Sequence, residues 1–361
     1  MKREDPGGKP AGWQCPLPAG ERFAGERDTI LLAHGGGGRL TQMLIESVFL
    51  DAFRNPALAA LHDGAVLGVD GGRIAFSTDS YVVRPLFFPG GDIGSLAVHG
   101  TVNDVAMCGA RPIALSAGFI LEEGLPLEDL RRVVRSMKEA AALCGVPIVT
   151  GDTKVVDRGK GDGIFINTTG LGLVPPGIEI DPRRARRGDV VLLSGPIADH
   201  GIAILSVREG LRFETELKSD SAPLHALVEK ILAAAGRDVH VLRDPTRGGV
   251  ASALNEIASL SGAGIRISEA AIPVREEVRG ACEILGLDPL YVANEGKCLA
   301  IVAREKAEAV LSALREDPLG REAAVIGEVV EEHPGKVVLR SRIGGSRIVE
   351  MLSGEPLPRI C

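Results

Sequence analysis

Aromatic residues are scarce in this sequence, at 3% of its 361 residues. Its hydrophobic cores must therefore be built mainly from Val, Ile, Leu and Ala. No apolar run approaches the roughly 20 residues that a membrane-spanning helix needs, and residues 1–28 contain no hydrophobic stretch typical of a signal peptide. With 45% hydrophobic and 25% charged residues, the composition indicates a globular protein, which we expect in the cytoplasm and away from any membrane.

Cysteine spacing and net charge argue against two further classes. The six cysteines form no CxxC pair, which disfavours a zinc site and a disulfide framework. The net charge of −7 offers no basic surface for nucleic acid, and we interpret Arg183–Arg187 as a solvated turn. Cys144, Cys282 and Cys298 lie among apolar neighbours and are expected in the core. Cys15 lies within residues 1–28, which we predict to be a disordered leader.

The remaining sequence predicts an α/β protein with mixed sheets in two domains. We place the N-terminal domain at residues 29–175, the second at residues 189–334, and a C-terminal segment with a mobile tail at residues 335–361. The clearest helix is Leu127–Cys144, which lies between Pro126 and Gly145. Alternating short apolar runs and longer periodic segments predict the other elements. The strands are Arg73–Ser77, Pro112–Leu121, Pro147–Thr150 and Ile164–Val174, and the helices lie near Asp199–Glu209, Ser221–Ala235, Gly248–Ser261 and Glu305–Arg315.

Four aspartates share one local setting, in which an apolar strand or helix meets a turn containing Gly, Ser or Thr. They are Asp63, Asp79, Asp104 and Asp152. Each alone is typical of a helix cap or a turn, but four together favour a shared site. Clustered carboxylates repel one another and would repel a polyphosphate unless divalent cations lie between them. Mg²⁺ commonly bridges Asp side chains and phosphates, so the predicted ligand is a magnesium nucleotide.

Two glycine-containing segments and one acidic motif could complete such a site. The run 34–39, HGGGGR, could cover phosphates with its backbone N–H groups and arginine, or could be a flexible turn. The segment 244–250, DPTRGGV, precedes a helical pattern whose N-terminus would attract anions, although a capped helix is the simpler interpretation. Glu295, in the sequence NEGK, is either a general base or the ionic partner of Lys297.

The sequence ends in Pro358-Arg359-Ile360-Cys361, which places a thiol at the tip of a proline-containing segment. Such a thiol can enter a slot too narrow for continuous polypeptide. The residues from Met351 onward can extend roughly 30 Å, enough to move between a buried and an exposed position. An incidental exposed thiol is the simpler interpretation unless the rest of the chain provides chemistry for it.

With these motifs in order, the chain resembles the superfamily of ATP-dependent enzymes that includes aminoimidazole ribonucleotide synthetase, selenophosphate synthetase and thiamine-phosphate kinase. Within that superfamily it is most similar to the HypE family of hydrogenase maturation proteins. The ending PRIC, following the other motifs, is what is specific to HypE-like proteins. The motifs that carry the resemblance are HGGGGR, FSTDS at 76–80, VNDVAMCGA at 102–110, GDTKVV at 151–156, DPTRGGV, NEGK and PRIC.

The resemblance implies a two-domain aminoimidazole ribonucleotide synthetase-like fold, a homodimer formed by the N-terminal domains, and binding of ATP with Mg²⁺. It also implies a reaction on Cys361. The thiol would accept a carbamoyl group from a HypF-like carbamoyltransferase, and the S-carboxamide would be dehydrated to a thiocyanate with ATP. The cyano group would pass to iron on a HypC–HypD-like complex, for a nickel-iron hydrogenase centre.

The family motifs also assign residues. Cys361, Lys154 and Glu295 would be catalytic, the last two as bases for the two N–H protons, although they could instead pair with each other or contact ATP. Asp63, Asp79, Asp104 and Asp152 would hold Mg²⁺. The set implied for ATP is Gly36, Gly37, Gly38, Arg39, Asp63, Asp79, Asn103, Asp104, Asp152, Asp244 and Thr246.

The sequence leaves two other functions open. A small-molecule kinase or synthetase of the same superfamily would not need Cys361. A nucleotide-binding scaffold would use its tail only to dock maturation partners.

Overall fold

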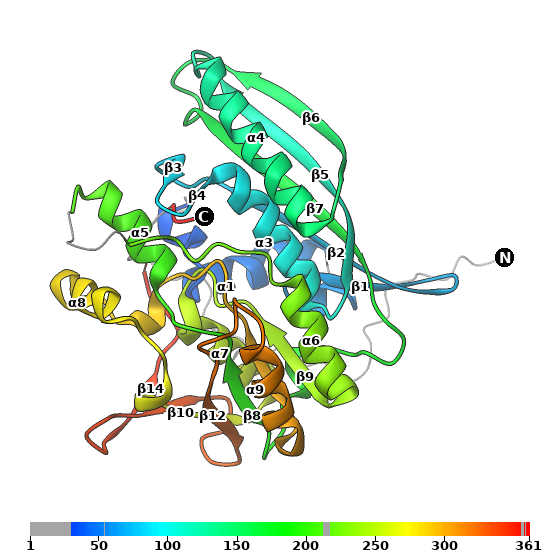
Figure 1. The fold of residues 1–361 in the computed structure, drawn as a ribbon, viewed down its shortest axis with the longest axis vertical. Helices are drawn as coiled ribbons and strands as arrows, with labels where there is room; N and C mark the ends of the chain where they lie inside the picture. The colour runs from blue at the N-terminus through cyan, green and yellow to red at the C-terminus, as the bar shows by residue number, and fades with distance from the viewer. Residues whose placement is uncertain (1–29, 54, 212–216, 355–356, 358) are drawn as a thin grey trace, which may run out of the picture. The chain divides into compact units, whose positions relative to one another are not determined.

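The computed structural model describes residues 30–361 except 54, 212–216, 355–356 and 358. Residues Leu31–Cys361 form one compact unit (Figure 1). The predicted leader, residues 1–28, lies outside the described residues. None of the helices in the described part is both long enough and apolar enough to cross a bilayer. The unit begins with short helical turns, which are η1 (Leu32–Gly35), α1 (Arg39–Leu44), η2 (Ile45–Phe49), α2 (Leu50–Phe53) and η3 (Leu58–Ala60).

A five-stranded sheet follows, in the order β1-β2-β7-β5-β6. Its neighbouring strands are antiparallel except β5 and β6, which are parallel. The helices α3 (Ile93–Met107) and α4 (Leu127–Cys144) pack on one face, and the short hairpin β3–β4 (Phe87–Phe88 and Gly91–Asp92) precedes α3. The strands are β1 (Ala65–Val69), β2 (Gly72–Tyr81), β5 (Arg111–Glu122), β6 (Ile148–Val156) and β7 (Ile164–Leu173).

Helix α3 is buried on all sides, which explains why its sequence shows no amphipathic period. Asp92 caps its N-terminus by accepting hydrogen bonds from Gly94 N at 2.7 Å and Ser95 N at 3.0 Å. Gly94 allows a close crossing with α4, since a Cβ there would lie 2.5 Å from the carbonyl oxygen of Val133. This helix was not predicted from the sequence, although it carries Asp104.

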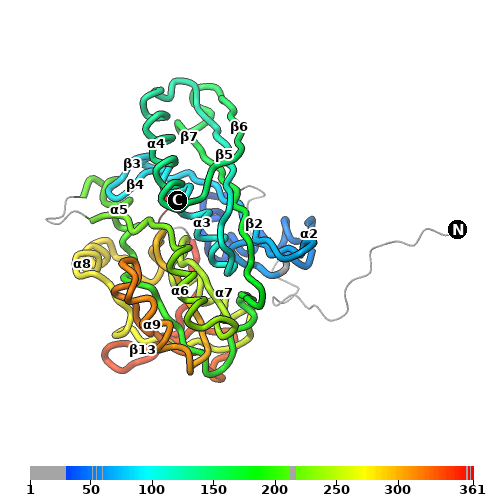
Figure 2. The backbone as a smooth tube through the Cα atoms, turned by 45° about the vertical axis from the view of Figure 1, so that its right-hand side comes forward, coloured from blue at the N-terminus to red at the C-terminus, as the bar shows by residue number. Residues whose placement is uncertain are grey.

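A seven-stranded sheet forms the second half, in the order β14-β13-β10-β12-β8-β11-β9. Its pairs are antiparallel except β10 and β13. Helices α6 and α9 cover one face and α7 covers the other (Figures 1 and 2). The strands are β8 (Val190–Leu193), β9 (Val239–Arg243), β10 (Gly264–Ser268), β11 (Leu299–Val302), β12 (Ala324–Val330), β13 (Val337–Arg340) and β14 (Ser346–Val349). The helices are α5 (Asp199–Arg208), α6 (His225–Ala235), α7 (Gly249–Ser261), α8 (Glu276–Leu285) and α9 (Ala307–Arg315), and the short turns are η4 (Pro182–Arg184), η5 (Gly236–Asp238), η6 (Glu269–Ala271), η7 (Pro289–Tyr291) and η8 (Arg304–Lys306).

The predicted α/β fold with mixed sheets is confirmed. Helix α4 has the predicted ends, and the other predicted strands and helices are present with ends shifted by a few residues. Helix α8 was not predicted. Cys144, Cys282 and Cys298 are buried in the hydrophobic clusters, as expected. Within the basic stretch, Arg183 pairs with Asp181 on the surface.

The two halves share one continuous interior. A single hydrophobic cluster joins Ala75 and Met107 of the first half to Leu224 and other residues of the second. Asn103 of α3 links the halves through polar contacts. Its Oδ1 accepts from Leu224 N at 2.7 Å, and its Nδ2 donates to the carbonyl oxygens of Ala222 at 3.0 Å and Glu295 at 3.3 Å.

We predict that Asn103→Ala lowers the free energy of unfolding by about 3 kcal/mol, because two buried backbone groups and one partly buried one lose their partner. Asn167→Ala, which removes an amide on the exposed face of β7, should cost less than about 1 kcal/mol. Urea unfolding of both variants measures the difference. Equal stability of Asn103→Ala and the parent chain would contradict this role.

Candidate active site

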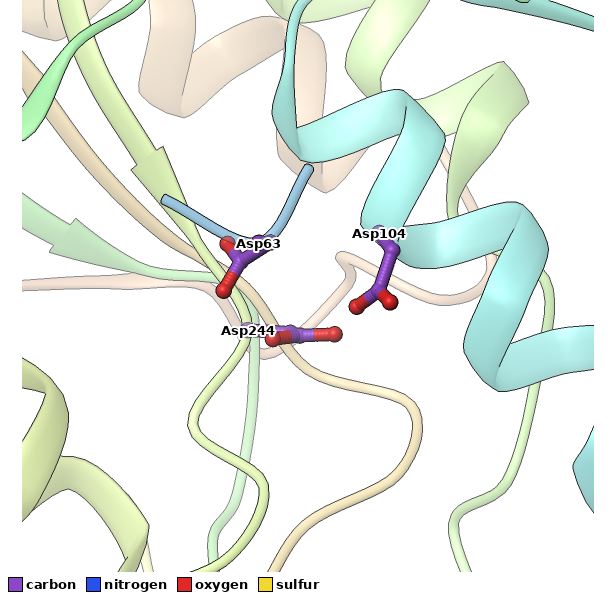
Figure 3. Close-up of side chains that lie close together, drawn as sticks. All are labelled: Asp63, Asp104 and Asp244. Atoms are coloured by element: carbon purple, nitrogen blue, oxygen red, sulfur yellow. The ribbon is translucent and has the colours of Figure 1, made fainter. Parts of the chain in front are cut away.

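Three aspartates from distant parts of the sequence meet between the two halves. Asp63 precedes β1, Asp104 lies in the last turn of α3, and Asp244 follows β9. Each contributes a carboxylate oxygen, and these atoms all lie within 4.8 Å of one another (Figure 3). This spacing suits several oxygens around one divalent cation.

The electrostatics of this cluster favour a bound cation. Burial, together with the negative charges of Asp244, Asp79 and Asp63, raises the pKa of Asp104 well above its usual value. The pKa of Asp244 is likewise raised, by burial and then by Asp63. A divalent cation would relieve this repulsion and keep both groups ionised. The hydroxyl of Ser77 lies 2.7 Å from Asp104 Oδ2 and fixes the direction of that carboxylate.

Arg243 provides part of the compensating charge. Its Nε lies 2.9 Å from Asp63 Oδ1, and its Nη2 lies 2.5 Å from Glu256 Oε2. Burial alone would lower the pKa of Arg243, but Asp63 and Glu256 raise it above its ordinary value. One guanidinium does not neutralise three carboxylates. Asp63 Oδ2 is buried and has no hydrogen-bond partner among the described residues, although it lies 3.5 Å from Nδ1 of His62.

The glycine run lies against the turn that precedes α7. Arg247 Nη1 donates to Gly35 O at 3.3 Å, and Arg247 Nη2 lies 3.9 Å from Asp79 Oδ1. A Cβ at Gly37 would lie only 2.6 Å from Arg247 Cβ, so the run can approach this turn because it lacks side chains. Arg39 N donates to the carbonyl oxygen of Leu352 at 2.8 Å. The segments 34–39 and 244–250, both predicted to bind phosphates, are therefore adjacent.

Asp79 and Asp244 raise the pKa values of both Glu295 and Cys361. Glu295 is buried, and its Oε1 has no hydrogen-bond partner in the described part of the chain. Burial, then Asp244 and Asp79, raise the pKa of Glu295 well above its usual value. Cys361 is also buried, and its pKa rises to about 12 through burial, with Glu295, Asp79 and Asp244 adding to the shift and Arg247 opposing it.

The Cys361 thiol and the Glu295 carboxylate are therefore both buried, and Glu295 Oε1 lacks a hydrogen-bond partner among the described residues. Both views of the chain place its C-terminal end close to the β3–β4 hairpin (Figures 1 and 2).

Asp152 and Lys154 lie elsewhere in the described chain. Both are on β6, at the edge of the first sheet, where their side chains are 70% exposed and pair with each other at 2.7 Å. They do not join the carboxylate cluster within one chain. Thr246 lies at the turn before α7, where its carbonyl oxygen accepts from Gly249 N at 3.0 Å.

The structure excludes one of the two interpretations of Glu295, the ion pair with Lys297. Lys297 Nζ pairs with Asp220 Oδ2 at 3.0 Å, so Glu295 is not its ionic partner. Asp220 Oδ1 accepts from Glu295 N at 3.0 Å and so orients the motif. Asp220 and Arg243 were both missed by the sequence analysis. Arg243 immediately precedes the 244–250 motif, which was the available signal, whereas Asp220 stands in no recognisable pattern.

Family comparisons agree with this geometry. Residues 61–174 match the family model described as AIR synthase related protein, N-terminal domain, and residues 186–340 match its C-terminal domain. The fold and site therefore define an AIR synthase related protein. The carbamoyl dehydratase HypE of Azotobacter vinelandii is 59% identical over 333 residues, which cover 92% of this chain and 97% of that protein.

Two solved structures are similar over most of their length. One, described as a HypE–HypF complex, has a TM-score of 0.82 at 51% identity and covers 86% of this chain and 99% of the solved one. The other, a HypE in complex with ATP, has a TM-score of 0.78 at 55% identity, with 92% and 100% covered. The chain belongs to the HypE family of carbamoyl dehydratases.

We predict that Asp104→Asn and Asp244→Asn each weaken Mg²⁺ binding about tenfold or more, because each removes a carboxylate from the cluster. Asp70→Asn, on the exposed turn between β1 and β2, is the matched control. Calorimetric titration of each folded variant with Mg²⁺ and a nucleotide provides the measurement. Affinity unchanged in Asp104→Asn would remove that residue from the cation site.

Proposed function

We propose that this chain dehydrates an S-carboxamide on Cys361 to a thiocyanate, using ATP, and so supplies the cyanide ligand for the iron of a nickel-iron hydrogenase. The observation that carries the proposal is the buried thiol of Cys361, whose pKa is raised by burial and by the charges of Glu295, Asp79 and Asp244. Membership of the HypE family supports it, as does the relative solved with ATP. We propose a cytoplasmic location for the reaction.

The proposed reaction removes one oxygen and two protons, the elements of water, from the amide. The amide carbon loses its oxygen and the nitrogen loses two protons, which leaves a C≡N bond on sulfur. Hydroxide is a poor leaving group at neutral pH. Bound ATP would supply the phosphoryl group that converts the amide oxygen into a better leaving group, so that oxygen ends in inorganic phosphate beside ADP. One nitrogen proton ends on phosphate and the other reaches solvent through a base.

The residues present fit a magnesium nucleotide. Asp63, Asp104 and Asp244 offer oxygens at the spacing that a cation requires, and Asp79 adds negative charge nearby. The run Gly36-Gly37-Gly38-Arg39, with Arg247 and Thr246 at the start of α7, provides backbone N–H groups and positive charge for phosphates. In this proposal Asp244 joins the magnesium ligands, while Asn103 supports the site from α3.

Glu295 is the proposed base within the chain. Its raised pKa makes the ionised carboxylate a stronger base than an exposed glutamate, and no group among the described residues occupies its Oε1. A small-molecule kinase would give no reason to bury the Cys361 thiol where such a base acts on its pKa, and neither would a docking scaffold.

We propose that Lys154 and Asp152 reach the site from a second copy of the chain. Their strand β6 lies at the sheet edge, and residues Ile148–Val155 are exposed. The face of the sheet away from α3 exposes Phe76 and Ile120, each 46% accessible, which suits an interface. The N-terminal domain, for which we keep residues 29–175, would form this homodimer, and residues 189–334 would form the second domain.

The partners follow from the same proposal. A HypF-like carbamoyltransferase would load the thiol, which the relative solved as a HypE–HypF complex supports. A HypC–HypD-like iron scaffold complex would accept the cyano group.

We expect intact mass to show a carbamoyl adduct after incubation with carbamoyl phosphate, ATP, Mg²⁺ and a carbamoyltransferase, followed by loss of one water mass. Cys361→Ser should form no adduct. Glu295→Gln should load normally but dehydrate at least about 100-fold more slowly, because the base is lost. Glu283→Gln, on the exposed side of α8, is the control. An adduct formed on Cys361→Ser would refute the assignment.

Mixed dimers can place Lys154. We predict that chains carrying Lys154→Met and chains carrying Cys361→Ser are inactive separately, yet recover up to about one quarter of the parent dehydration rate when co-refolded, because random pairing gives about half mixed dimers with one complete site each. A mixture of Lys154→Met with Cys361→Ser,Lys154→Met chains is the control. Absence of recovery in proven mixed dimers would place Lys154 within its own chain's site.

A further inference from the structure

The last residues of the chain pair with the backbone that follows β2. Val82 N donates to Cys361 O at 3.0 Å, and Arg84 N donates to Arg359 O at 3.3 Å. The tail end therefore lies beside residues 82–84, although Arg359 has a left-handed backbone with φ 55° and the segment is a turn rather than a strand. Arg208 Nη2 also donates to Arg359 O, at 2.8 Å.

The carbonyl between these two has a different partner. Neither hydrogen bond from residues 82–84 goes to the Ile360 carbonyl. His200 Nε2 lies 2.8 Å from Ile360 O. Ile360 is only 3% exposed, so without this imidazole its carbonyl would be a buried acceptor that water scarcely reaches.

The chemistry of this contact fixes the histidine tautomer. A carbonyl oxygen only accepts, so Nε2 carries the proton and donates. Nδ1 then accepts from the Ser219 hydroxyl, which lies 2.7 Å away, and Ser219 Oγ in turn accepts from Ser221 N at 3.1 Å. The ring of Phe88 packs edge-on against the imidazole, with centroids 5.7 Å apart. Burial lowers the pKa of His200, which is consistent with a neutral ring.

Side-chain contacts of Arg359 hold the same segment from the other side. Its Nε donates to Val82 O at 3.1 Å, and its guanidinium pairs with Asp162. Asp162 also pairs with Arg84, at 3.5 Å. These contacts hold the tail in place but leave the middle carbonyl to His200 alone among the described residues.

We propose that His200 is a positioning residue for the dehydration step: its Nε2–H holds the Ile360 carbonyl and thereby places the Cys361 sulfur beside Glu295. The proposal rests on the proposed function for its catalytic consequence. Its structural part, a clamp on the docked tail, stands independently. The backbone bonds from Val82 and Arg84 hold the carbonyls of residues 361 and 359, and the imidazole holds the carbonyl of the residue directly before the Cys361 thiol.

Two substitutions of His200 separate the donor from the ring. His200→Gln can place an amide N–H near the former Nε2, whereas His200→Leu has a similar bulk and no donor. In the full-length chain, iodoacetamide alkylation of Cys361, followed by mass analysis of the C-terminal peptide, reports how often the tail leaves its slot. We expect alkylation about tenfold faster in His200→Leu and within about twofold of the parent in His200→Gln.

Single-turnover dehydration of the loaded chain gives the catalytic readout. We expect His200→Leu to dehydrate about tenfold more slowly, while carbamoyl loading is unchanged or faster, because loading uses the displaced tail. A melting curve establishes that each variant is folded. If His200→Leu does not fold, Ser219→Ala, which frees the tautomer, should raise alkylation about threefold.

The alkylation rates of the two His200 variants decide whether the clamp exists. Alkylation in His200→Leu equal to the parent, or equally raised in His200→Gln, overturns the clamp. If the parent adduct never loses water, the proposed function fails, and the alkylation arm still decides whether His200 holds the tail.

Discussion

Repulsion among buried carboxylates is the constraint on which the rest of this structure depends. Asp63, Asp104 and Asp244 come from a loop, a helix and a strand end, and their mutual repulsion raises the pKa values of Asp104 and Asp244. Arg243 provides some compensating charge from within the fold. In the proposed function a bound cation would provide more, so that ligand binding would complete the site. The two halves of the chain meet where this charge is concentrated.

The buried thiol imposes a second requirement. With its pKa raised to about 12, Cys361 is almost entirely protonated at neutral pH in the docked position, and a protonated thiol is a poor nucleophile. In the proposed function the tail would therefore accept the carbamoyl group when it is displaced into solvent, where the thiol would have an ordinary pKa. The enclosed position suits the later step, in which water must be kept away from the activated amide. The proposed reaction thus needs two environments for one residue, which a moving tail would provide.

Much of the fold was predictable because local signals agree with it. Helix α4 has proline and glycine at its ends and an amphipathic face, and its limits were predicted correctly. Helix α3 was missed because complete burial removes the periodicity that reveals a helix. The motifs pointed to Asp63, Asp104, Asp244 and Glu295, but only tertiary contacts separate the exposed Asp152 from this cluster. His200 could not have been found, because its role depends on a carbonyl that is distant in sequence.

Helix α3 places two neighbours with different tasks side by side. Asn103 binds the backbone of the second half, and Asp104, the next residue, faces the aspartate cluster. Any rotation of α3 that loosened the first contact would also turn the second away from its companions. The contact between the two halves therefore also orients the carboxylate cluster. Substitutions in this contact that leave every carboxylate in place can still lower the affinity of the cluster for a cation.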